Sequence, residues 1–332
     1  MAVKHSVTDV ACDLCPHLCV IPEGAAGDCR VRVNLGGRLI ATTYGRPSAM
    51  HIDPMEKKPL YHFLPGTEVF SIGTAGCNMH CRNCQNWQLS QRGGEEMETV
   101  HRTMPADLVD LARREGCAGI AYTYNDPIVY YEYVEDTARL AREAGLRSVF
   151  VTAAFINREP LRRLCRVLDA TTADIKAFDD RFYQEVCSTR LKPVLDALVT
   201  FREEGVWLEV SHLVIPTLND DLARIRQLCQ WVRDELGADT PFHLLRFRPM
   251  YRMRNLPATP NETLARARRE ALDIGLHHVY IGNVPGEEAE STYCPRDGTR
   301  VIHRIGFRTV ENRLTADGRC PVCRQAIAGI WS

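Results

Sequence analysis

The stretch GTAGCNMHCRNCQNWQLSQ, residues 73–91, carries three cysteines within eight positions. These thiols are Cys77, Cys81 and Cys84. The run just before them, EVFSIG (residues 68–73), has the apolar content of a buried strand. Thiols clustered in a loop after a strand indicate metal or redox chemistry. The question is which kind.

Three kinds of site use cysteines spaced in this way. A structural zinc site needs four ligands, and the loop offers three thiols with His80 between them. A thioredoxin-type pair would use Cys81 and Cys84 and leave Cys77 without a role. Three thiolates from one loop suit three irons of a [4Fe–4S] cluster, and the fourth iron then stays open to a ligand. The position after a first strand favours the cluster.

From residue 67 to residue 282, short apolar runs alternate with amphipathic stretches. The predicted strands are residues 68–73, 119–124, 148–153, 172–178, 206–215, 241–247 and 277–282. The predicted helices between them are residues 105–115, 128–144, 160–165, 192–204, 221–236 and 262–274. Strands separated by crossover helices predict a parallel sheet of the α/β class. Six or seven such units fit a barrel, complete or partial, better than an open sheet.

In parallel barrels the chemistry lies at the C-terminal ends of the strands. Several polar residues of this chain fall at those ends, beside the cysteine loop. They are Asn125, Asp126, Asp174, Lys176, His212 and Arg246. The arrangement is therefore coherent with an active site at one end of the barrel.

Composition narrows the remaining choices. The chain has 332 residues, 45% of them apolar and 25% charged, and a formal charge of −1, which gives no reason to expect a nucleic-acid or membrane partner. No apolar run reaches the ~18–20 residues of a membrane span, and the start lacks the pattern of a signal peptide. A cytoplasmic protein is expected. Its fourteen cysteines then favour metal or redox sites over disulfides.

Two further cysteine groups flank the barrel pattern. Residues 1–62 are predicted to form a cysteine-rich module in which NLGGRL (residues 34–39) makes a hairpin turn. Its four cysteines could complete a zinc site or bind a second cluster. They are Cys12, Cys15, Cys19 and Cys29. The barrel is assigned residues 63–285.

Residues 286–332 form the last predicted unit, a zinc-knuckle-like extension. Cys320 and Cys323 flank a Pro-Val pair, as in a zinc knuckle, and CPRDG (residues 294–298) offers a partner. In that partner Asp297 stands where a second thiol would complement Cys294. Zinc accepts carboxylate oxygen, so three cysteines and one aspartate could hold it. A hairpin that has lost its metal is the alternative.

At this point the sequence resembles a known family. The loop GCNMHCRNCQNW resembles radical SAM enzymes of the branch near pyruvate formate-lyase activating enzymes. The resemblance runs almost end to end with the radical SAM component of the AmmeMemoRadiSam system. It rests on CDLCPHLCVIPEGAAGDCRVR, MEKKPLYHFLPGT, IAYTYNDP, DIKAF, LVIPTLND, RFRP, YIGNVPGEEAESTYCP and the closing GIW.

This resemblance implies a partial TIM barrel of the (β/α)6 type and a [4Fe–4S] cluster on the three loop cysteines. It also implies that S-adenosylmethionine is cleaved to a 5′-deoxyadenosyl radical that takes hydrogen from a substrate the sequence does not identify. Tyr124, Asn125 and Asp126 stand where relatives recognise the cofactor's amino group, although relatives usually carry Glu in place of Asp126. His212 and Arg246 are further candidates for cofactor contacts.

Three residues are candidates for catalysis by the same resemblance. Asp174 and Lys176 are similar to an acidic and basic pair at the barrel mouth, with a structural ion pair as the alternative. Cys187 matches a cysteine of relatives that could donate hydrogen or link a substrate. A small buried thiol is the alternative for Cys187.

The resemblance also suggests partners. The substrate could be a small molecule or a protein, and a flavodoxin or ferredoxin could supply the electron. Memo-like and AMMECR1-like proteins are expected as associates. Two other functions stay open: a glycyl radical enzyme activase, and a non-catalytic metalloprotein that serves electron transfer or scaffolding.

Overall fold

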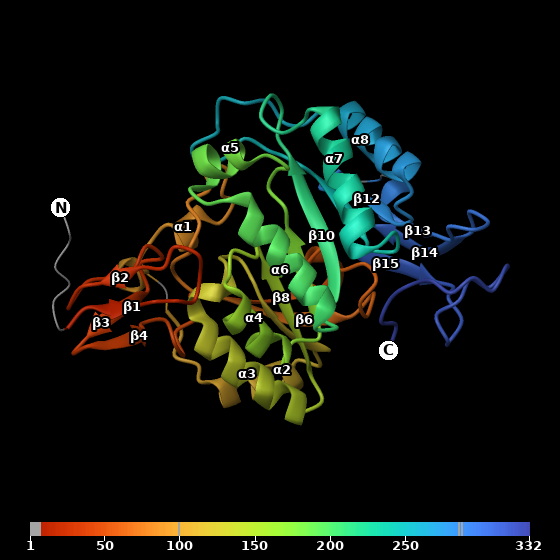
Figure 1. Cartoon of the computed structure of the whole chain (residues 1–332). Coiled ribbons are helices and arrows are strands. Elements are labelled where there is room, and N and C mark those ends of the chain that lie inside the picture. The colour runs from red at the N-terminus through yellow and green to blue at the C-terminus, as the bar shows by residue number, and fades with distance from the viewer. Residues whose placement is uncertain (1–7, 99, 285, 287) are drawn as a thin grey trace.

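One eight-stranded sheet forms the centre of the fold (Figure 1). The computed structural model describes residues 8–98, 100–284, 286 and 288–332. The strand order is β12-β11-β10-β9-β8-β7-β6-β5. Neighbours from β6 to β12 are parallel, and β5 joins β6 antiparallel. The strands are β5 Ala49–Pro54, β6 Glu68–Gly73, β7 Gly119–Tyr122, β8 Arg147–Thr152, β9 Ala170–Asp174, β10 Trp207–Val214, β11 Phe242–Arg246 and β12 Val279–Gly282.

Helices follow the parallel strands and cover the outer side of the sheet (Figure 1). They are α1 Trp87–Ser90, α2 Pro105–Arg114, α3 Tyr131–Glu143, α4 Arg158–Cys165, α5 Asp180–Phe182, α6 Leu191–Glu203, α7 Leu222–Trp231 and α8 Asn261–Ile274. Shorter 3-10 and π segments are η1 Met55–Lys57, η2 Gly94–Glu96, η3 Pro127–Tyr130, η4 Tyr183–Cys187, η5 Val232–Leu236 and η6 Glu288–Glu290. Within the described ranges, every helix is too short or too polar to cross a bilayer.

The predicted fold class is confirmed. Each predicted strand and helix has a counterpart, and the main apolar core lies between the helices and the sheet. The strands β7 and β12 are buried along their whole length, as expected for parallel strands covered on both faces. The edge strands β5 and β12 do not pair with each other, so the barrel is partial.

The N-terminal region differs from the prediction at its boundary. Residues 49–54, assigned to the cysteine-rich module, form β5 and belong to the barrel sheet. The module itself consists of two hairpins, β1 (Val10–Ala11) with β2 (Val20–Ile21) and β3 (Arg32–Leu35) with β4 (Arg38–Ala41). The predicted turn lies between β3 and β4, where Gly36 and Gly37 both have positive φ. Residues 1–7 of the predicted module lie outside the described residues.

Residues 55–64, here called the floor segment, close the end of the barrel where the parallel strands begin. Met55, Leu60 and Phe63 pack against residues near the start of the strands, among them Val69 of β6 and Ala170 of β9. All five side chains are buried. The cysteine loop lies at the other end of the same strands, so the floor segment leaves that end free for chemistry.

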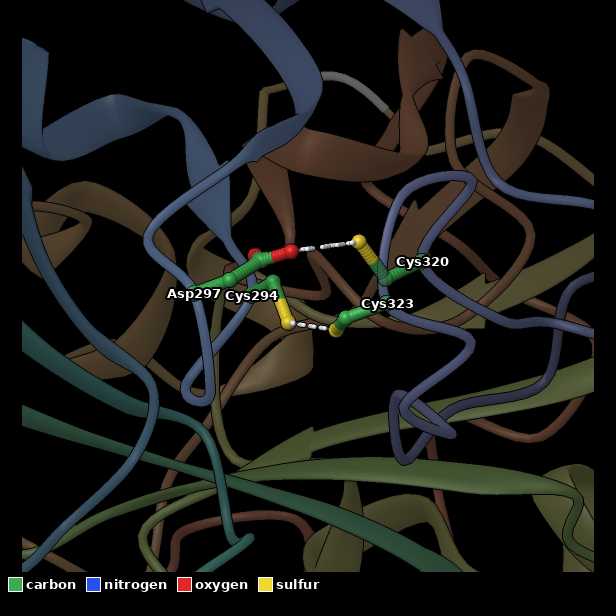
Figure 2. A group of neighbouring side chains, drawn as sticks. All are labelled: Cys294, Asp297, Cys320 and Cys323. Atoms are coloured by element: carbon green, nitrogen blue, oxygen red, sulfur yellow. Dashed lines mark hydrogen bonds between the residues drawn. The ribbon is translucent and has the colours of Figure 1, made fainter.

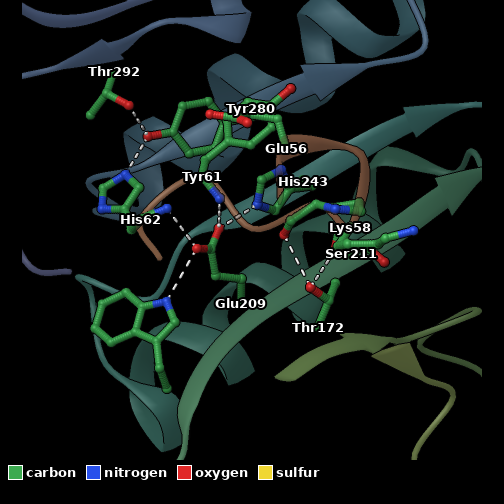
Figure 3. Close-up of polar contacts among 12 residues, drawn as sticks. Glu56, Lys58, Tyr61, His62, Thr172, Glu209, Ser211, His243, Tyr280 and Thr292 are labelled. Carbon is green, nitrogen blue, oxygen red and sulfur yellow. Dashed lines mark hydrogen bonds and ion pairs between the residues drawn. The ribbon is translucent and has the colours of Figure 1, made fainter. Parts of the chain in front are cut away.

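A buried carboxylate ties the floor segment to the barrel (Figure 3). Glu209 of β10 is fully buried and accepts hydrogen bonds from the backbone N–H groups of Tyr61 (3.0 Å) and His62 (2.7 Å). It also accepts from the indole N–H of Trp207 (3.1 Å) and pairs with the imidazole of His243 (2.7 Å). Four donors therefore satisfy one carboxylate in the interior of the barrel.

The C-terminal extension holds the floor segment from the other side. It contains β13 (Thr292–Tyr293), β14 (Arg300–Ile305) and β15 (Arg308–Asn312), which form an antiparallel sheet. Arg304 of β14 donates to the carbonyl of Tyr61 at 2.6 Å. The central carbon of its guanidinium lies 4.4 Å from the centre of the Tyr61 ring. The backbone N–H of Ile330 donates to the carbonyl of His62 at 2.7 Å. The end of the described chain therefore packs beneath the barrel.

The free energy of unfolding should depend on pH through Asp53, a buried carboxylate of β5. Asp53 accepts hydrogen bonds from Lys57 and Lys58, both at 2.7 Å, and from the hydroxyl of Tyr124 at 2.9 Å. Burial works to raise the pKa of Asp53, but the two lysines outweigh it and hold this pKa well below the ordinary value. A carboxyl with a depressed pKa stabilises the fold above its unfolded-state pKa of about 3.9, and this stabilisation is lost as pH falls below that value.

We therefore expect Asp53→Asn to lower the free energy of unfolding at pH 7, and this deficit to shrink as pH falls from 5 to 3. Urea unfolding at pH 7, 5 and 3 measures the difference between the variant and the parent. Asp196→Asn is the matched control, because Asp196 forms an exposed pair with Lys192. Curves for Asp53→Asn and the parent that stay parallel through this range would contradict the prediction.

Candidate functional site

The cysteine loop opens into a cavity of about 240 Å³ at the C-terminal ends of the strands. Cys77, Cys81 and Cys84 line this cavity, here called the loop cavity. The other strand ends contribute Tyr124, Asn125 and Asp126 after β7, Thr152 and Ala153 at β8, Asp174 and Lys176 at β9, Leu213 at β10 and Leu245 at β11. The structure thus brings the three predicted cluster ligands together with five other predicted site residues.

The loop is fixed by close backbone contacts. A Cβ on Gly73 would lie 2.8 Å from the carbonyl oxygen of Thr123, and one on Gly76 would lie 2.5 Å from that of Cys29. Gly76 also has a φ of +82°, which favours glycine. Asn125 fastens the same turn, because its side-chain amide donates to the Gly76 carbonyl at 2.7 Å and its oxygen accepts from the backbone N–H of Thr74 at 3.0 Å.

The loop thiols sit in surroundings that disfavour free thiolates. Burial raises the pKa of Cys77 well above its ordinary value, and burial also raises the pKa of Cys84. The pKa of Cys81 is raised well above the ordinary value, first by a hydrogen bond with Cys187 and then by burial. A positively charged metal group at this place would supply the charge that makes three buried thiolates stable.

The donor set fits a cluster of several irons. Thiolate ligands select zinc and iron–sulfur clusters among the common metal groups. The three thiols come from one loop and line one cavity, an arrangement that suits three irons of a [4Fe–4S] cluster.

Asp126 caps a helix and joins two strand ends. Its carboxylate accepts from the backbone N–H of Ile128 at 3.2 Å, which caps η3, and from Ala153 N–H (2.8 Å) and Thr152 Oγ1 (2.9 Å) of the next strand end. Burial raises the pKa of Asp126. Because Asp126 also lines the loop cavity, capping and a contact to a ligand are compatible.

Asp174 and Lys176 form an ion pair inside the same cavity. Lys176 Nζ lies 2.8 Å from Asp174 Oδ2, and Ser211 donates to the other oxygen of Asp174. Burial works to lower the pKa of Lys176, but Asp174 and Cys81 outweigh it and raise this pKa above its ordinary value. The surroundings therefore favour the protonated amine of Lys176 beside the thiol loop.

Three predicted site residues do not line the loop cavity: His212, Cys187 and Arg246. His212 is adjacent to Leu213 on β10, and because neighbours on a strand point to opposite faces, it points away from the cavity that Leu213 lines. Its Nδ1 instead donates to the carbonyl of Ile175 at 2.8 Å. Cys187 is fully buried behind the loop, beside Cys81, and does not line the cavity, which favours the reading of a small buried thiol.

Arg246 lies in a neighbouring cavity of about 290 Å³, here called the side cavity. Its Nε donates to the carbonyl of Thr259 at 3.0 Å. Both cavities share four residues, so they adjoin. The shared residues are Asn83, Gln85, Leu213 and Asn283.

Sequence reasoning missed the roles of two asparagines. Asn125, predicted to contact a cofactor, lines the loop cavity and also fastens the thiol loop. Asn86, just after the third cysteine, donates to the carbonyl of Tyr124 at 2.7 Å and so joins the loop to the end of β7. Its position within the motif was the available signal, because an amide two residues after a ligand is placed to orient that turn.

The four N-terminal cysteines gather around one small cavity, together with His17 and Asn78. Burial raises the pKa of Cys15 to about 12 and also raises that of Cys29. The structure thus brings the predicted N-terminal ligand set together, and its assignment to zinc or a second cluster stays a prediction.

Comparison with known proteins agrees with this site. The family model described as "Radical SAM superfamily" matches residues 71–229. An uncharacterized protein of Methanocaldococcus jannaschii is 44% identical over 319 residues, which cover 96% of this chain and 95% of that protein. The pyruvate formate-lyase-activating enzyme of Clostridium pasteurianum is 25% identical over 183 residues, 51% of this chain and 73% of the enzyme.

A solved structure shares the fold. Streptococcus suis SuiB bound to S-adenosylmethionine matches with a TM-score of 0.52 at 13% identity, over 69% of this chain and 53% of that one. The family match begins within β6 and contains the thiol loop and the strand ends that line its cavity up to β10. Residues 71–229 of this chain therefore form a domain of the Radical SAM superfamily.

Proposed function

We propose that this chain is a radical SAM enzyme in which Cys77, Cys81 and Cys84 hold the cluster. A [4Fe–4S] cluster and S-adenosylmethionine are the cofactors of the superfamily to which residues 71–229 belong. The observation that carries the proposal is that three buried thiols from one loop share a single cavity with polar residues from the ends of the neighbouring strands. When bound, the two cofactors supply an electron and a 5′-deoxyadenosyl radical that removes hydrogen from a substrate.

The chain's own residues prepare that chemistry. Asn125 holds the turn before the first thiol, so the three sulfurs keep their places when metal binds. Lys176 puts a fixed positive charge next to the thiolates and lowers the cost of burying their negative charge. Asp126 ties two strand ends together and forms part of the wall against which S-adenosylmethionine would lie.

We place the substrate in the side cavity. It adjoins the loop cavity and is lined by Arg246, Arg248 and Asn283 together with Glu290 and Phe307 from the C-terminal extension. Two guanidinium groups suit an anionic group on a substrate. Asp174, the ion-pair partner of Lys176 in the loop cavity, stays our candidate for a catalytic residue.

A second candidate function is the activation of a partner protein by installing a glycyl radical. The similarity to the pyruvate formate-lyase-activating enzyme of Clostridium pasteurianum favours it. Membership of the AmmeMemoRadiSam system, with Memo-like and AMMECR1-like associates in the cytoplasm and a flavodoxin or ferredoxin donor, is the finer proposal that we carry from the sequence motifs. A non-catalytic role would leave the shared cavity without a use.

The test is to reconstitute the full chain anaerobically, add reductant and S-adenosylmethionine, and measure the products. We expect 5′-deoxyadenosine and methionine in equal amounts, and deuterium in the 5′-deoxyadenosine when the true substrate is labelled. A glycyl radical signal on an added partner protein would select the activase. Reconstituted protein that carries the cluster and leaves S-adenosylmethionine intact would overturn the proposal.

A further inference from the structure

The C-terminal extension brings four potential metal ligands together (Figure 2). They are Cys294, Asp297, Cys320 and Cys323, and one ligand atom from each lies within 4.8 Å of all the others. Cys294 and Cys320 are buried, Cys323 is half-buried and Asp297 is exposed. The site lies on the opposite side of the barrel from α1 and the thiol loop in Figure 1, so the proposed radical chemistry does not use it.

The spacing is that of ligands around one tetrahedral ion. With Zn–S of about 2.3 Å and Zn–O of about 2.0 Å, the ligand atoms of a tetrahedral zinc lie about 3.5–3.8 Å apart. The sulfurs of Cys294 and Cys323 are 3.5 Å apart, and the sulfur of Cys320 lies 3.7 Å from Asp297 Oδ2. The two sulfurs are too far apart for a disulfide, in which they would be about 2.05 Å apart.

Two turns of the same design carry the four ligands. In the first, Cys294 N–H donates to the Thr299 carbonyl (2.8 Å) and Gly298 N–H donates to the Cys294 carbonyl (2.9 Å). In the second, Cys320 N–H donates to the Gln325 carbonyl (2.9 Å) and Arg324 N–H donates to the Cys320 carbonyl (3.0 Å).

The match extends to backbone dihedrals and to the sulfur contacts. The fifth residue of each turn has a positive φ, +71° at Gly298 and +61° at Arg324. In each turn the backbone N–H groups of the third and fourth residues donate to the sulfur of the first cysteine. The fourth residue is Asp297 in one turn and Cys323 in the other. Asp297 therefore occupies the position that holds a thiolate in the second turn.

Asp297 is also oriented for this role. Its Oδ1 accepts from the backbone N–H of Thr299 at 3.0 Å, which fixes the plane of the carboxylate, and both oxygens lie close to the sulfur of Cys320, Oδ2 at 3.7 Å and Oδ1 at 3.8 Å. Hydrogen bonds of this kind orient metal-ligating carboxylates in proteins.

We propose that this cluster binds one zinc ion through three thiolates and one carboxylate, and that the zinc fastens the extension beneath the barrel. The apolar support for the two turns is small, with Val301, Ile302 and Ile327 as the buried partners of the two buried cysteines. Small units with so little apolar core commonly use a metal for stability. The second turn leads directly into Ile330, which pairs with Phe63 of the floor segment.

The experiment measures zinc bound to the full chain by elemental analysis after a chelator wash. Cys323→Ala should lose one equivalent of zinc per chain relative to the parent. Asp297→Ala should release its zinc at least about ten-fold faster, whereas Asp297→Cys should retain it at least as long as the parent. Cys165→Ala, at a buried cysteine on α4, is the matched control and should keep the parental zinc content.

A second readout keeps the test valid if Cys323→Ala loses zinc because its extension unfolds. Hydrogen exchange at Val301 and Ile302 should speed up in Asp297→Ala and stay slow in Asp297→Cys. Equal zinc contents in the parent and Cys323→Ala, or identical behaviour of the two Asp297 variants, would overturn the proposal. Iron in this site in place of zinc would overturn the choice of metal. Cleavage of S-adenosylmethionine is not the readout, so this result is independent of the proposed function.

Discussion

Replacing Cys81 by alanine should abolish the formation of 5′-deoxyadenosine, to the level seen without protein. Cys81 is the central thiol of the loop, and its neighbours Cys77 and Cys84 cannot supply the missing ligand. Two thiolates leave a second iron without a protein ligand, so the cluster should be lost or should change its form. The measurement is product formation per cluster under reducing, oxygen-free conditions, with iron and sulfide determined on the same sample.

Cys165→Ala is the matched control for this variant, because Cys165 is also a buried cysteine but lies on α4, outside the loop cavity. It should keep the parental iron content and product formation. Cys187→Ala tests the buried neighbour of the central thiol, because Cys187 forms a hydrogen bond with Cys81. Substantial product formation by Cys81→Ala, at the parental iron content, would show that the loop is not the cluster site.

Replacing Glu209 by alanine should destabilise the chain by about 3–5 kcal/mol. The substitution removes the only carboxylate that the His243 imidazole contacts among the described ion pairs, and it leaves the two floor N–H groups and an indole N–H buried without their acceptor. Each unsatisfied buried donor costs about 1–3 kcal/mol, and the cavity left by the side chain adds to this. Denaturant unfolding of the anaerobic, cluster-loaded protein measures the change.

The control for this variant is Glu203→Ala. Glu203 at the end of α6 pairs with Arg158, and both side chains are about half exposed, so the loss should be below about 1 kcal/mol. A destabilisation by Glu209→Ala no larger than that of Glu203→Ala would mean that water or neighbouring groups replace the carboxylate. The assigned role of Glu209 as the link between the barrel and the floor segment would then fail.

Periodicity in the sequence was sufficient to predict the barrel, because each strand and helix has its own apolar pattern. The pattern could not predict where β9 ends. β9 pairs with β8 as far as Ala173 and with β10 as far as Asp174, and Lys176 lines the loop cavity, so the strand ends at Asp174, four residues before the apolar pattern does. The end of the strand is decided by tertiary contacts of a charged side chain, which local apolar content does not record.

The same limit applies to β5 and to the contacts of the floor segment. Residues 49–54 read as part of a cysteine-rich module because no local signal distinguishes an edge strand of the barrel from a hairpin strand. Glu209 is the one carboxylate in β10, and its partners lie at Tyr61, His62 and His243. A buried charge is easy to notice in a sequence, but partners this distant in the chain come only from the fold.

The site was predictable in part for a similar reason. The three thiols and the polar residues at the strand ends are visible as motifs, and they do converge. The face on which His212 lies depends on the register of β10, and the depth of Cys187 depends on how η4 packs behind the loop. Asp297 was predicted as a possible ligand, and the structure adds that it lies close to the three cysteines.

The contact between the floor segment and the last residues also constrains how the protein is made. His62 bonds to the carbonyl of Ala328, 266 residues later in the chain. A ribosome adding 5–20 residues per second needs roughly 10–50 s to synthesise that interval. Throughout this time the nascent barrel lacks the contact between residues 328–330 and the floor segment, and we expect it to expose apolar surface around Phe63. We therefore expect a newly synthesised chain to engage chaperones until translation passes residue 330, and circular permutants that join these segments early to need them less.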